Sequence, residues 1–392
     1  MRRIVSLLVA LACATSVQAD FPIIQTVDSE GNVGSSSSLA LDSSGHPRIA
    51  YWDQTNLDLR YAAWNGLSWD IQPLDSTGDT GRVPSLALDS GDYAHITYWD
   101  NNCDRTRYAY ENSSGWHLQT VTPPGENAPG PSSLALDSAG HPHMSYLAWL
   151  PTSRQTLRYG SSDGSSWTFE TVDNTGTYAG NFNSLALDSN GWPHISYLYE
   201  AGGSRHLRYA AWDGVALAWD ITTVHTGGHV GLGTSLALDS SDYPHISYAD
   251  VANENLMYAW WDPALNGGAG DWDMTPVDST GDAQWYNAAT SLALDSSGSA
   301  HISYYNQTNQ ELRYAVGSGW SWDIQTVDSS GPYVYQNLSL ALDSSGFAHI
   351  SYYDGTNDDL KYANNTPEVG TWLLLACTGA VGAAVRRRRE KK

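Results

Sequence analysis

The string Ser-Leu-Ala-Leu-Asp, which first stands at residues 38–42, decides the fold because the chain contains it seven times. Its copies begin at Ser38, Ser85, Ser133, Ser184, Ser235, Ser291 and Ser339. Successive copies lie 47 to 56 residues apart. Self-similarity at such a period indicates an array of one supersecondary unit.

Three further strings follow the first one in the repeat. Their clearest copies are His-Ile-Ser-Tyr at 194–197, Leu-Arg-Tyr-Ala at 59–62 and Trp-Asp-Ile-Gln-Thr-Val-Asp at 322–328. All are rich in Leu, β-branched and aromatic residues, and turn signals such as Asp-Ser-Ser-Gly and Asn-Gly separate them. Four short strands in each repeat resemble the blade of a β-propeller and indicate an all-β fold.

The two ends of the repeated region complement each other. The seventh unit stops after its third string, at residues 360–363, while Ile24–Asp28 matches Ile324–Asp328 residue for residue. We therefore predict a seven-bladed β-propeller over residues 20–366, with four antiparallel strands in each blade. The N-terminal strand would complete the last blade, which leaves no open sheet edge at the seam.

The end segments predict export to the cell surface, outer membrane or extracellular matrix of a bacterium. Residues 1–19 have the charged start, apolar stretch and small-residue cleavage site of a signal peptide. Residues 367–392 contain Pro-Glu, an apolar stretch and an arginine cluster at 386–389. This order is similar to the PEP-CTERM sorting tail of Gram-negative bacteria, although Val369 stands where that family has Pro. The resemblance implies a tail-processing enzyme as a partner. The alternative is a plain membrane anchor, and in both cases the membrane is contacted only through the tail.

Charge and cysteine content exclude several classes of function. The chain has 42 acidic and 19 basic residues, a net charge of −23, and eight of the basic residues lie in the two end segments. Phosphate backbones are bound by basic surfaces, so a nucleic-acid partner is excluded. Cys103 is the one cysteine between residues 20 and 366, which excludes a disulfide framework and a four-cysteine zinc site there.

Polar residues that recur in the blades are expected to belong to the scaffold. The histidines that begin the second string would lie too far apart around a ring to share a metal, so each should bond a local turn. The Arg60 position should pair with blade carboxylates, and the Tyr51 position should be core. Asp42 and its copies should cap turns. A Ca²⁺ ion at these carboxylates is the alternative, and we predict no other cofactor.

Variable loops between a fourth strand and the next first strand are the candidate ligand-binding surface. They carry Tyr178, Phe182, Trp285, Tyr286, Tyr333 and Tyr335. Aromatic rings beside Asn, Asp and Gly suit sugars, because the ring stacks on the apolar face while polar neighbours take the hydroxyls. The alternative is that these rings pack against their own loops. We predict no catalytic residue.

The repeats resemble the lectin-like and sialidase-like seven-bladed propellers in layout. We therefore predict an exported, non-enzymatic binding protein that recognises carbohydrate, or a cell-surface or matrix component, through the aromatic loops. The Asp-Ser-Ser-Gly turn differs in spacing from the Asp-box of sialidases, which speaks against sialidase activity. One alternative is a glycoside hydrolase or polysaccharide lyase with its site at the channel mouth. Few blade-specific charged residues support it, and the exceptions are Arg82, Arg105, Arg154 and Arg205. Another alternative is a passive matrix component.

Overall fold

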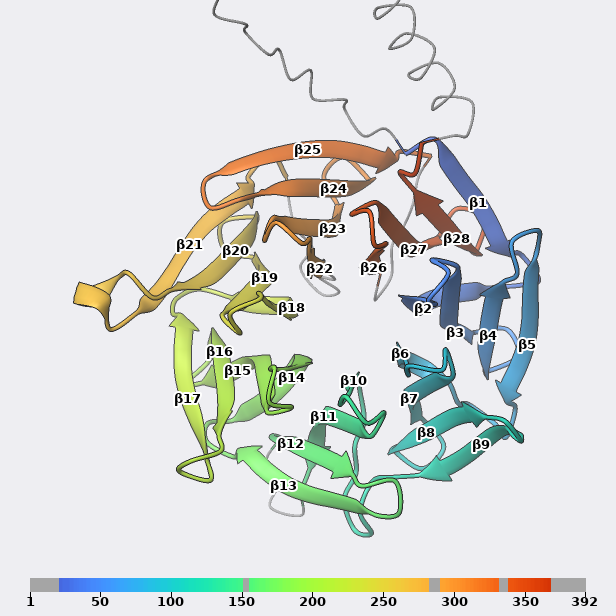
Figure 1. The fold of residues 1–392 in the computed structure, drawn as a ribbon, viewed down its shortest axis with the longest axis horizontal. Helices are drawn as coiled ribbons and strands as arrows, with labels where there is room; N and C mark the ends of the chain where they lie inside the picture. Colours follow the sequence, from blue (N-terminus) through green and yellow to red (C-terminus); the bar gives the residue numbers. More distant parts are fainter. Residues whose placement is uncertain (1–20, 151–154, 282–289, 331–337, 368–392) are drawn as a thin grey trace, which may run out of the picture.

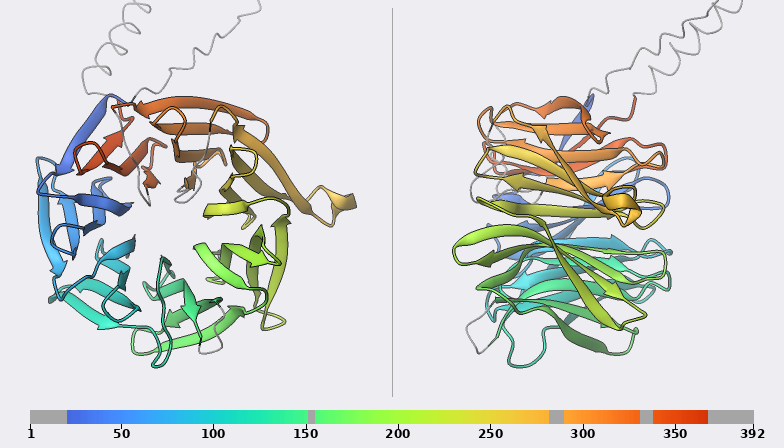
Figure 2. Two further views of the ribbon diagram at one scale, coloured as in Figure 1. Left: turned by 180° about the vertical axis from the view of Figure 1, so that it is seen from behind. Right: turned by 90° about the vertical axis from the view of Figure 1, so that its left-hand side faces the viewer.

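The protein is a ring of β-sheets around a central channel. A computed structural model describes residues 21–150, 155–281, 290–330 and 338–367. These residues form seven four-stranded antiparallel units, which Figure 1 shows arranged around one axis. Figure 2 shows the same ring from behind and from the side. The expected seven-bladed, all-β propeller is therefore confirmed.

Each blade runs from an inner strand at the channel to an outer strand at the rim. The strands of the first four blades are β2 (Val33–Leu41), β3 (Pro47–Asp53), β4 (Asp58–Trp64), β5 (Trp69–Asp75); β6 (Arg82–Leu88), β7 (Ala94–Asp100), β8 (Arg105–Asn112), β9 (Gly115–Thr120); β10 (Ser132–Leu136), β11 (Pro142–Trp149), β12 (Gln155–Ser162), β13 (Trp167–Asp173); and β14 (Tyr178–Leu187), β15 (Pro193–Ala201), β16 (Ser204–Asp213), β17 (Ala218–His225). The last three blades are β18 (Val230–Leu238), β19 (Pro244–Asp250), β20 (Asn255–Asp262), β21 (Asp271–Asp278); β22 (Thr290–Leu294), β23 (Ala300–Asn306), β24 (Glu311–Ser318), β25 (Ser321–Asp328); and β26 (Ser339–Leu342), β27 (Ala348–Asp354), β28 (Asp359–Asn364) with β1 (Ile23–Asp28). A short 3₁₀ helix, η1 (Asn266–Gly268), lies between β20 and β21.

The seam closes as the sequence predicts. Strand β1 pairs antiparallel with β28, so that Ile23 lies opposite Asn364 and Gln25 opposite Tyr362. The outer strand of the seventh blade therefore comes from the start of the chain. This pairing joins the first and last blades and removes the free edge that β28 would otherwise expose.

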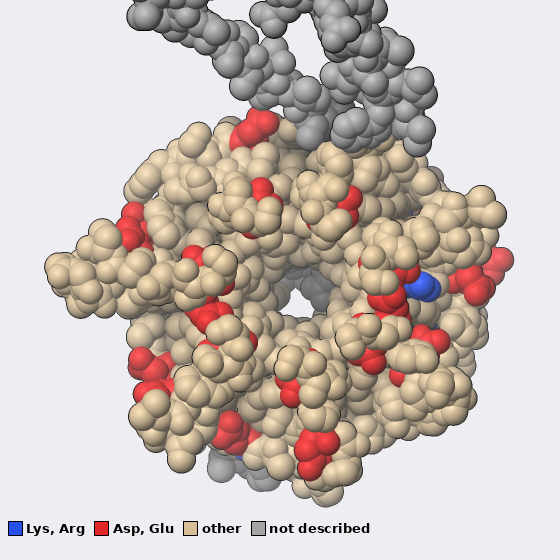
Figure 3. Space-filling model, in the orientation of Figure 1, with Lys and Arg blue, Asp and Glu red and all other residues tan. Residues whose placement is uncertain are grey.

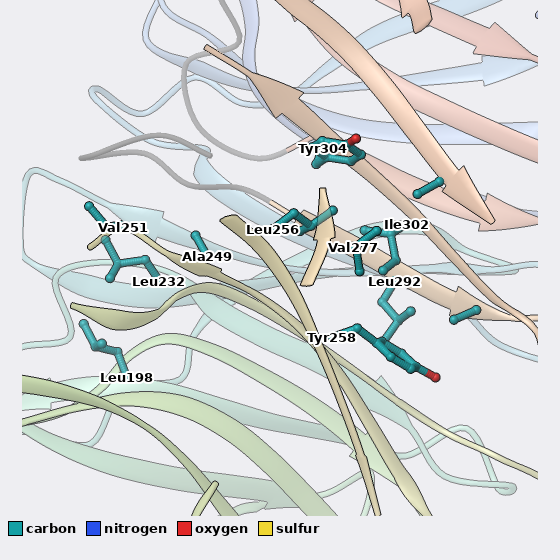
Figure 4. Close-up of a cluster of buried hydrophobic side chains, with 12 residues drawn as sticks. Leu198, Leu232, Ala249, Val251, Leu256, Tyr258, Val277, Leu292, Ile302 and Tyr304 are labelled. Carbon is teal, nitrogen blue, oxygen red and sulfur yellow. The ribbon is translucent and has the colours of Figure 1, made fainter. Parts of the chain in front are cut away.

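The hydrophobic core lies between neighbouring blades rather than in the middle of the ring. Leu39 and its copies on the inner strands are buried, as are the second-strand residues Ile49 and Tyr51 and their copies. Figure 4 shows one such cluster, in which Tyr258 of β20 and Ile302 of β23 come from adjacent blades. Because each blade packs on its neighbours, the fold extends by repetition and not by enlarging a single core.

A ring of serine hydroxyls near the channel adds a second connection between blades, which the sequence analysis missed. The serine that begins Ser-Leu-Ala-Leu-Asp accepts a hydrogen bond, 2.9–3.0 Å long, from the backbone N–H of the following leucine's copy in the next blade. The pairs are Ser38–Leu86, Ser85–Leu134, Ser133–Leu185, Ser184–Leu236, Ser235–Leu292, Ser291–Leu340 and Ser339–Leu39. The last pair closes the circle between the seventh and first blades.

The predicted end segments, residues 1–19 and 367–392, lie outside the described residues except for Pro367. The boundaries at residues 1–19, 20–366 and 367–392 therefore stay predictions, as do the signal peptide and the sorting tail. Within the described ranges, no helix has the length and apolar character needed to cross a membrane.

Candidate functional site

The junctions between blades hold most of the protein's buried ionic groups. The tyrosine that ends His-Ile-Ser-Tyr donates a hydrogen bond of 2.6–2.7 Å to an aspartate on the preceding blade's outer strand at five junctions. An arginine or lysine of the third strand pairs with the same carboxylate, as Arg60 does with Asp28 at 3.0 Å. The expected scaffold role of the tyrosine and arginine series is confirmed.

One junction departs from this pattern at two positions together. Between the fourth and fifth blades, His225 replaces the aspartate and Met257 replaces the arginine. Nδ1 of His225 lies 2.9 Å from the hydroxyl of Tyr248. Burial lowers the pKa of His225, so this junction is held by neutral groups.

The histidine series has a structural partner in every blade where it occurs. Nδ1 of each histidine contacts the hydroxyl of a third-strand tyrosine, and Nε2 lies 3.4–3.9 Å from the turn aspartate. In the first blade Arg48 takes the histidine's place and pairs with Asp42 at 2.9 Å. The tyrosine contact gives each histidine a structural role, whereas among the described residues His301 is the one member of this series with a hydrogen bond to its turn aspartate, at 3.4 Å.

The turn aspartates accept hydrogen bonds from backbone N–H groups of their own turns. Asp42 Oδ1 accepts the N–H groups of Ser44 and His46 at 2.9 and 2.8 Å. Its copies make the same contacts, which is the expected turn cap. In the part of the chain that the structure describes, no cluster of three His, Cys, Asp or Glu side chains could hold a metal ion.

Two of the six predicted aromatic rim residues can be placed. Tyr178 begins β14 and its ring is 40% exposed. Phe182 instead packs against the core cluster of Figure 4 and lines the channel. Its backbone has φ 50°, a conformation that β-strands do not use. Trp285, Tyr286, Tyr333 and Tyr335 lie outside the described residues.

The central channel is visible as an opening in Figure 3. A cavity in it has a volume of about 170 Å³ and is lined mainly by Ser, Thr, Pro and Asn side chains. Among the described residues that line this cavity, none has a side chain that exchanges a proton near neutral pH.

A larger cleft of about 510 Å³ opens on the rim where the fourth-to-first-strand loops lie. Its walls come from the seventh, first and second blades. They consist of Asn32, Ser35, Trp52, Gln54, Arg82, Tyr353, Gly355 and Asp358. This cleft brings an acid, a base, a cation and an indole together, although the sequence analysis singled out only Arg82.

Tyr353 and Asp358 form the titratable pair of the cleft. The Tyr353 hydroxyl donates a 2.5 Å hydrogen bond to Asp358 Oδ1, and it lies 3.1 Å from Asn32 Oδ1. Burial, together with the neighbouring Asp358 carboxylate, raises the pKa of Tyr353 well above its usual range. Tyr353 therefore keeps its proton at neutral pH.

The guanidinium group of Arg82, which also lines the cleft, is fixed in position by its contacts. Its Nε and Nη2 atoms donate to the two carboxylate oxygens of Asp79 at 2.8 and 2.7 Å. Its guanidinium carbon lies 4.5 Å from the ring centre of Trp52 and 5.5 Å from that of Trp99. The bidentate pair and the stacking fix the guanidinium plane. Nη1 has no hydrogen bond among the described residues and remains a donor for a ligand.

The sequence does contain a signal for this cleft. The position after the repeated tyrosine varies from blade to blade, with Trp52, Trp99, Leu147, Leu198, Ala249, Tyr305 and Tyr353. The aromatic members all lie in the sixth, seventh, first and second blades, which are neighbours on the ring. A comparison of the repeats for differences, not for shared residues, would have pointed to this side of the rim.

Comparison with known proteins gives structural relatives only. No protein-family model and no curated protein sequence matches the chain. A PL25 polysaccharide lyase, named as an ulvan lyase, is similar with a TM-score of 0.54 when bound to a chain of GlcA(1-4)Rha3S units and 0.53 in a second structure. The bound form is 13% identical and the match covers 89% of this chain and 98% of the lyase.

Two other solved structures are similar over most of this chain. A variant of AofleA from Arthrobotrys oligospora has a TM-score of 0.50 at 12% identity, covering 79% of this chain and 90% of that one. A leech intramolecular trans-sialidase has a TM-score of 0.46 at 12% identity, covering 90% and 71%. At such identities the matches with the lyase and the AofleA variant, whose TM-scores are 0.50 or higher, show a shared fold and nothing more.

The comparisons correct the predicted function. We expected a non-enzymatic binding protein, but the polysaccharide lyase, which is similar over most of both chains, is named as an enzyme that acts on a carbohydrate. The findings favour the enzymatic alternative. Shared repeats misled the prediction, because the scaffold residues that dominate the sequence hide the few residues that differ between blades.

Proposed function

We propose that the protein is a polysaccharide-cleaving enzyme of the lyase type, whose site is the cleft between the seventh, first and second blades. The observation that carries the proposal is the meeting of Tyr353, Asp358, Arg82 and Trp52 in one cleft. The fold shared with the ulvan lyase supports it, since that structure holds a polysaccharide chain on the same kind of propeller.

The cleft suits elimination better than hydrolysis. Glycoside hydrolases ordinarily place two carboxylic acids on either side of the scissile bond. Asp358 is the one carboxylate among the residues that line this cleft. An elimination instead needs a base, a proton donor and a positive group, and Asp358, Tyr353 and Arg82 supply these three.

The proposed reaction acts on a uronate unit of the polymer. Arg82 Nη1 binds the uronate carboxylate, which makes the proton on the neighbouring ring carbon C5 more acidic. The Asp358 carboxylate takes that proton, and the electrons of the C–H bond form a C4=C5 double bond as the C4–O bond breaks. The leaving oxygen receives a proton from Tyr353, and the proton that Asp358 took from C5 passes to Tyr353 along their hydrogen bond, which restores both groups. Trp52 provides an apolar wall for the sugar ring.

Export, which the N-terminal segment predicts, would bring the enzyme to such polymers outside the cell. The tail-processing partner and the membrane contact through residues 367–392 remain part of this proposal, as does a surface or matrix location.

A cleavage assay with matched variants tests the proposal. The purified protein is incubated with uronate-containing and neutral polysaccharides, and both the new reducing ends and the ultraviolet absorbance of the unsaturated sugar are followed. We expect absorbance and reducing ends to rise together on a uronate polymer. Tyr353→Phe should lower the rate by about 10²–10⁴-fold, the usual contribution of a positioned proton donor.

Tyr305→Phe is the matched control, because Tyr305 holds the equivalent place in the sixth blade and is not among the residues that line the cleft. It should retain full activity. Reducing ends without absorbance would contradict elimination. Absence of cleavage on every polymer by a folded sample would refute the proposed function.

A further inference from the structure

A second cavity lies on the opposite rim, at the seam between the seventh and first blades. Its volume is about 320 Å³, at the lower end of the range of small-ligand sites. It is lined by Ile23, Gln25, Ser44, Gly45, His46, Pro47, Trp64, Asp343, His349, Tyr362, Asn364 and Thr366. None of these residues lines the cleft proposed as the cleavage site.

The seam explains why a cavity can open here. The other six blades connect their third and fourth strands by a hairpin, such as the one between β4 and β5. In the seventh blade these two strands are β28 and β1, which belong to opposite ends of the chain and so have no hairpin between them. Ile23 of β1, Asn364 at the end of β28 and Thr366 just beyond it are among the residues that line the cavity. Figure 1 shows β1 beside β28 at this seam.

His349 offers this cavity a buried hydrogen-bond donor. Asn364 Nδ2 donates to the Tyr362 hydroxyl at 3.2 Å, so we assign the hydroxyl proton to the contact with His349 Nδ1. The imidazole hydrogen then lies on Nε2. This atom has no hydrogen-bond partner within the described part of the chain, although His349 is 95% buried. An unpaired buried donor is costly, which favours a ligand that accepts from it.

An acceptor stands across from this donor at a suitable distance. Asp343 Oδ2 lies 3.8 Å from His349 Nε2, too far for a direct hydrogen bond. A hydroxyl group between them could accept from Nε2–H and donate to the carboxylate. Burial lowers the pKa of His349, which favours the neutral ring, while Asp343 caps its own turn through Oδ1 and leaves Oδ2 toward the imidazole. The cavity therefore offers a donor and an acceptor close together, which suits a neutral hydroxyl group.

The remaining walls are typical of sugar recognition. Trp64 is half-buried and is held edge-on by Trp69 at 5.4 Å between ring centres. Ile23 adds apolar surface, and the amides of Gln25 and Asn364 add polar groups. An indole face beside hydroxyl-binding groups matches the apolar and polar sides of a pyranose.

We propose that the seam cavity binds a neutral sugar unit, with one hydroxyl bridging His349 Nε2 and Asp343 Oδ2 and the ring against Trp64. This site is independent of the cleft, and it would hold a neutral part of a glycan on the face opposite to the site of cleavage.

Ligand-observed saturation-transfer NMR on the purified protein tests this site, with neutral hexoses, 6-deoxyhexoses and their disaccharides as probes. We expect saturation transfer from the protein to at least one neutral sugar and none to the corresponding uronic acid. Trp64→Ala should weaken binding at least tenfold. Trp212→Ala is the matched control, because Trp212 packs edge-on against Trp219 at 5.5 Å in the fourth blade but does not line this cavity.

A second pair of variants tests the bridging hydroxyl. Asp343→Asn keeps the turn-capping oxygen but changes the acceptor that faces His349, and it should lower affinity several-fold. Asp295→Asn makes the same change in the sixth blade and should have no effect. Absence of transfer to every neutral sugar, or equal losses with Trp64→Ala and Trp212→Ala, would overturn the proposal. Binding measured in Tyr353→Phe separates it from the proposed cleavage, because that variant should lose cleavage and keep binding.

Discussion

The ion pair between the fifth and sixth blades allows a quantitative test of how the blades are held together. Arg313 Nη1 lies 2.8 Å from Asp278 Oδ2, and the two side chains are 14% and 2% exposed. Removing one partner of a buried pair costs about 3–5 kcal/mol, because the other charge stays buried. Asp278 also accepts hydrogen bonds from Tyr304 and Thr280, which remain after Arg313→Met. We therefore expect a cost near the lower limit, about 3 kcal/mol.

The natural junction of His225 and Met257 supplies the compensating change. Asp278→His alone should also cost about 3 kcal/mol, near the lower limit, since Arg313 keeps its contact with Glu311 at 2.8 Å. The double variant Asp278→His/Arg313→Met removes both charges and reproduces the junction between the fourth and fifth blades. It should cost about 3 kcal/mol and not the sum of the two, which gives a coupling of about 3 kcal/mol.

Urea unfolding of the four proteins at neutral pH measures this coupling. Arg205→Met is the control, because Arg205 pairs with Glu200 at 3.2 Å while its side chain is 35% exposed. An exposed pair should contribute less than about 1 kcal/mol. The reasoning fails if the coupling is below about 0.5 kcal/mol, the level at which independent sites are additive, or if Arg313→Met costs no more than Arg205→Met.

Further outcomes follow from the serine ring, the backbone, the histidines and the charge of the body. Ser339→Ala should cost about 1 kcal/mol in urea unfolding, as should Ser133→Ala, and a clearly smaller loss at Ser339 would mean that the ring is not closed at the seam. Gly81 has φ 83°, and a Cβ there would lie 2.4 Å from the Leu59 Cα, so Gly81→Ala should unfold the first-to-second-blade junction and abolish cleavage; a native urea midpoint would contradict this. Cleavage of a uronate polymer should speed up as salt rises from about 0.01 to 0.15 M, because the Debye length falls from about 30 to 8 Å and repulsion by the acidic body is screened; a rate that only falls with salt would argue against this electrostatic picture. Burial lowers the folded-state pKa of the six buried histidines, so the unfolded chain takes up more protons as pH falls through about 6.5, and stability should be complete near pH 7.5 and decline toward pH 5.5. A urea midpoint that stays constant over this interval would contradict the assignment. These histidines are His95, His143, His194, His245, His301 and His349.

The fold could be predicted almost completely because the same packing and turn-capping interactions recur in every blade of a propeller. Each copy of Ser-Leu-Ala-Leu-Asp buries a leucine between blades and ends in a capped turn, so seven weak signals support one another. The match between Ile24–Asp28 and Ile324–Asp328 then fixed the seam. The role of the serine was missed, because a hydrogen bond between residues about 50 positions apart leaves no local pattern.

The candidate sites could be predicted only in part. The cleft that we propose opens on the predicted rim, but the aromatic loop residues that could be placed do not line it. Phe182 packs inward instead, because its left-handed backbone turns the ring toward the channel and the core. Tyr353 and Asp358 were not singled out, since neither belongs to a recognisable sequence motif. Their hydrogen bond depends on the conformation of the loop between β27 and β28.

Variation between the repeats distinguishes scaffold residues from site residues. At a scaffold position, a change in one residue is accompanied by a change in the residue that it contacts. Where His225 replaces an aspartate, Met257 replaces the arginine, so the exchange preserves a neutral, packed junction. The changes that produce Arg82 and Tyr353 have no such compensating partner in the scaffold. Arg82 is fixed by Asp79 and Trp52, and Tyr353 contacts Asp358 from its own blade and Asn32 from the loop between β1 and β2. These contacts fix the positions of two residues that depart from the repeated pattern, and both line the same cleft, where a ligand could contact them.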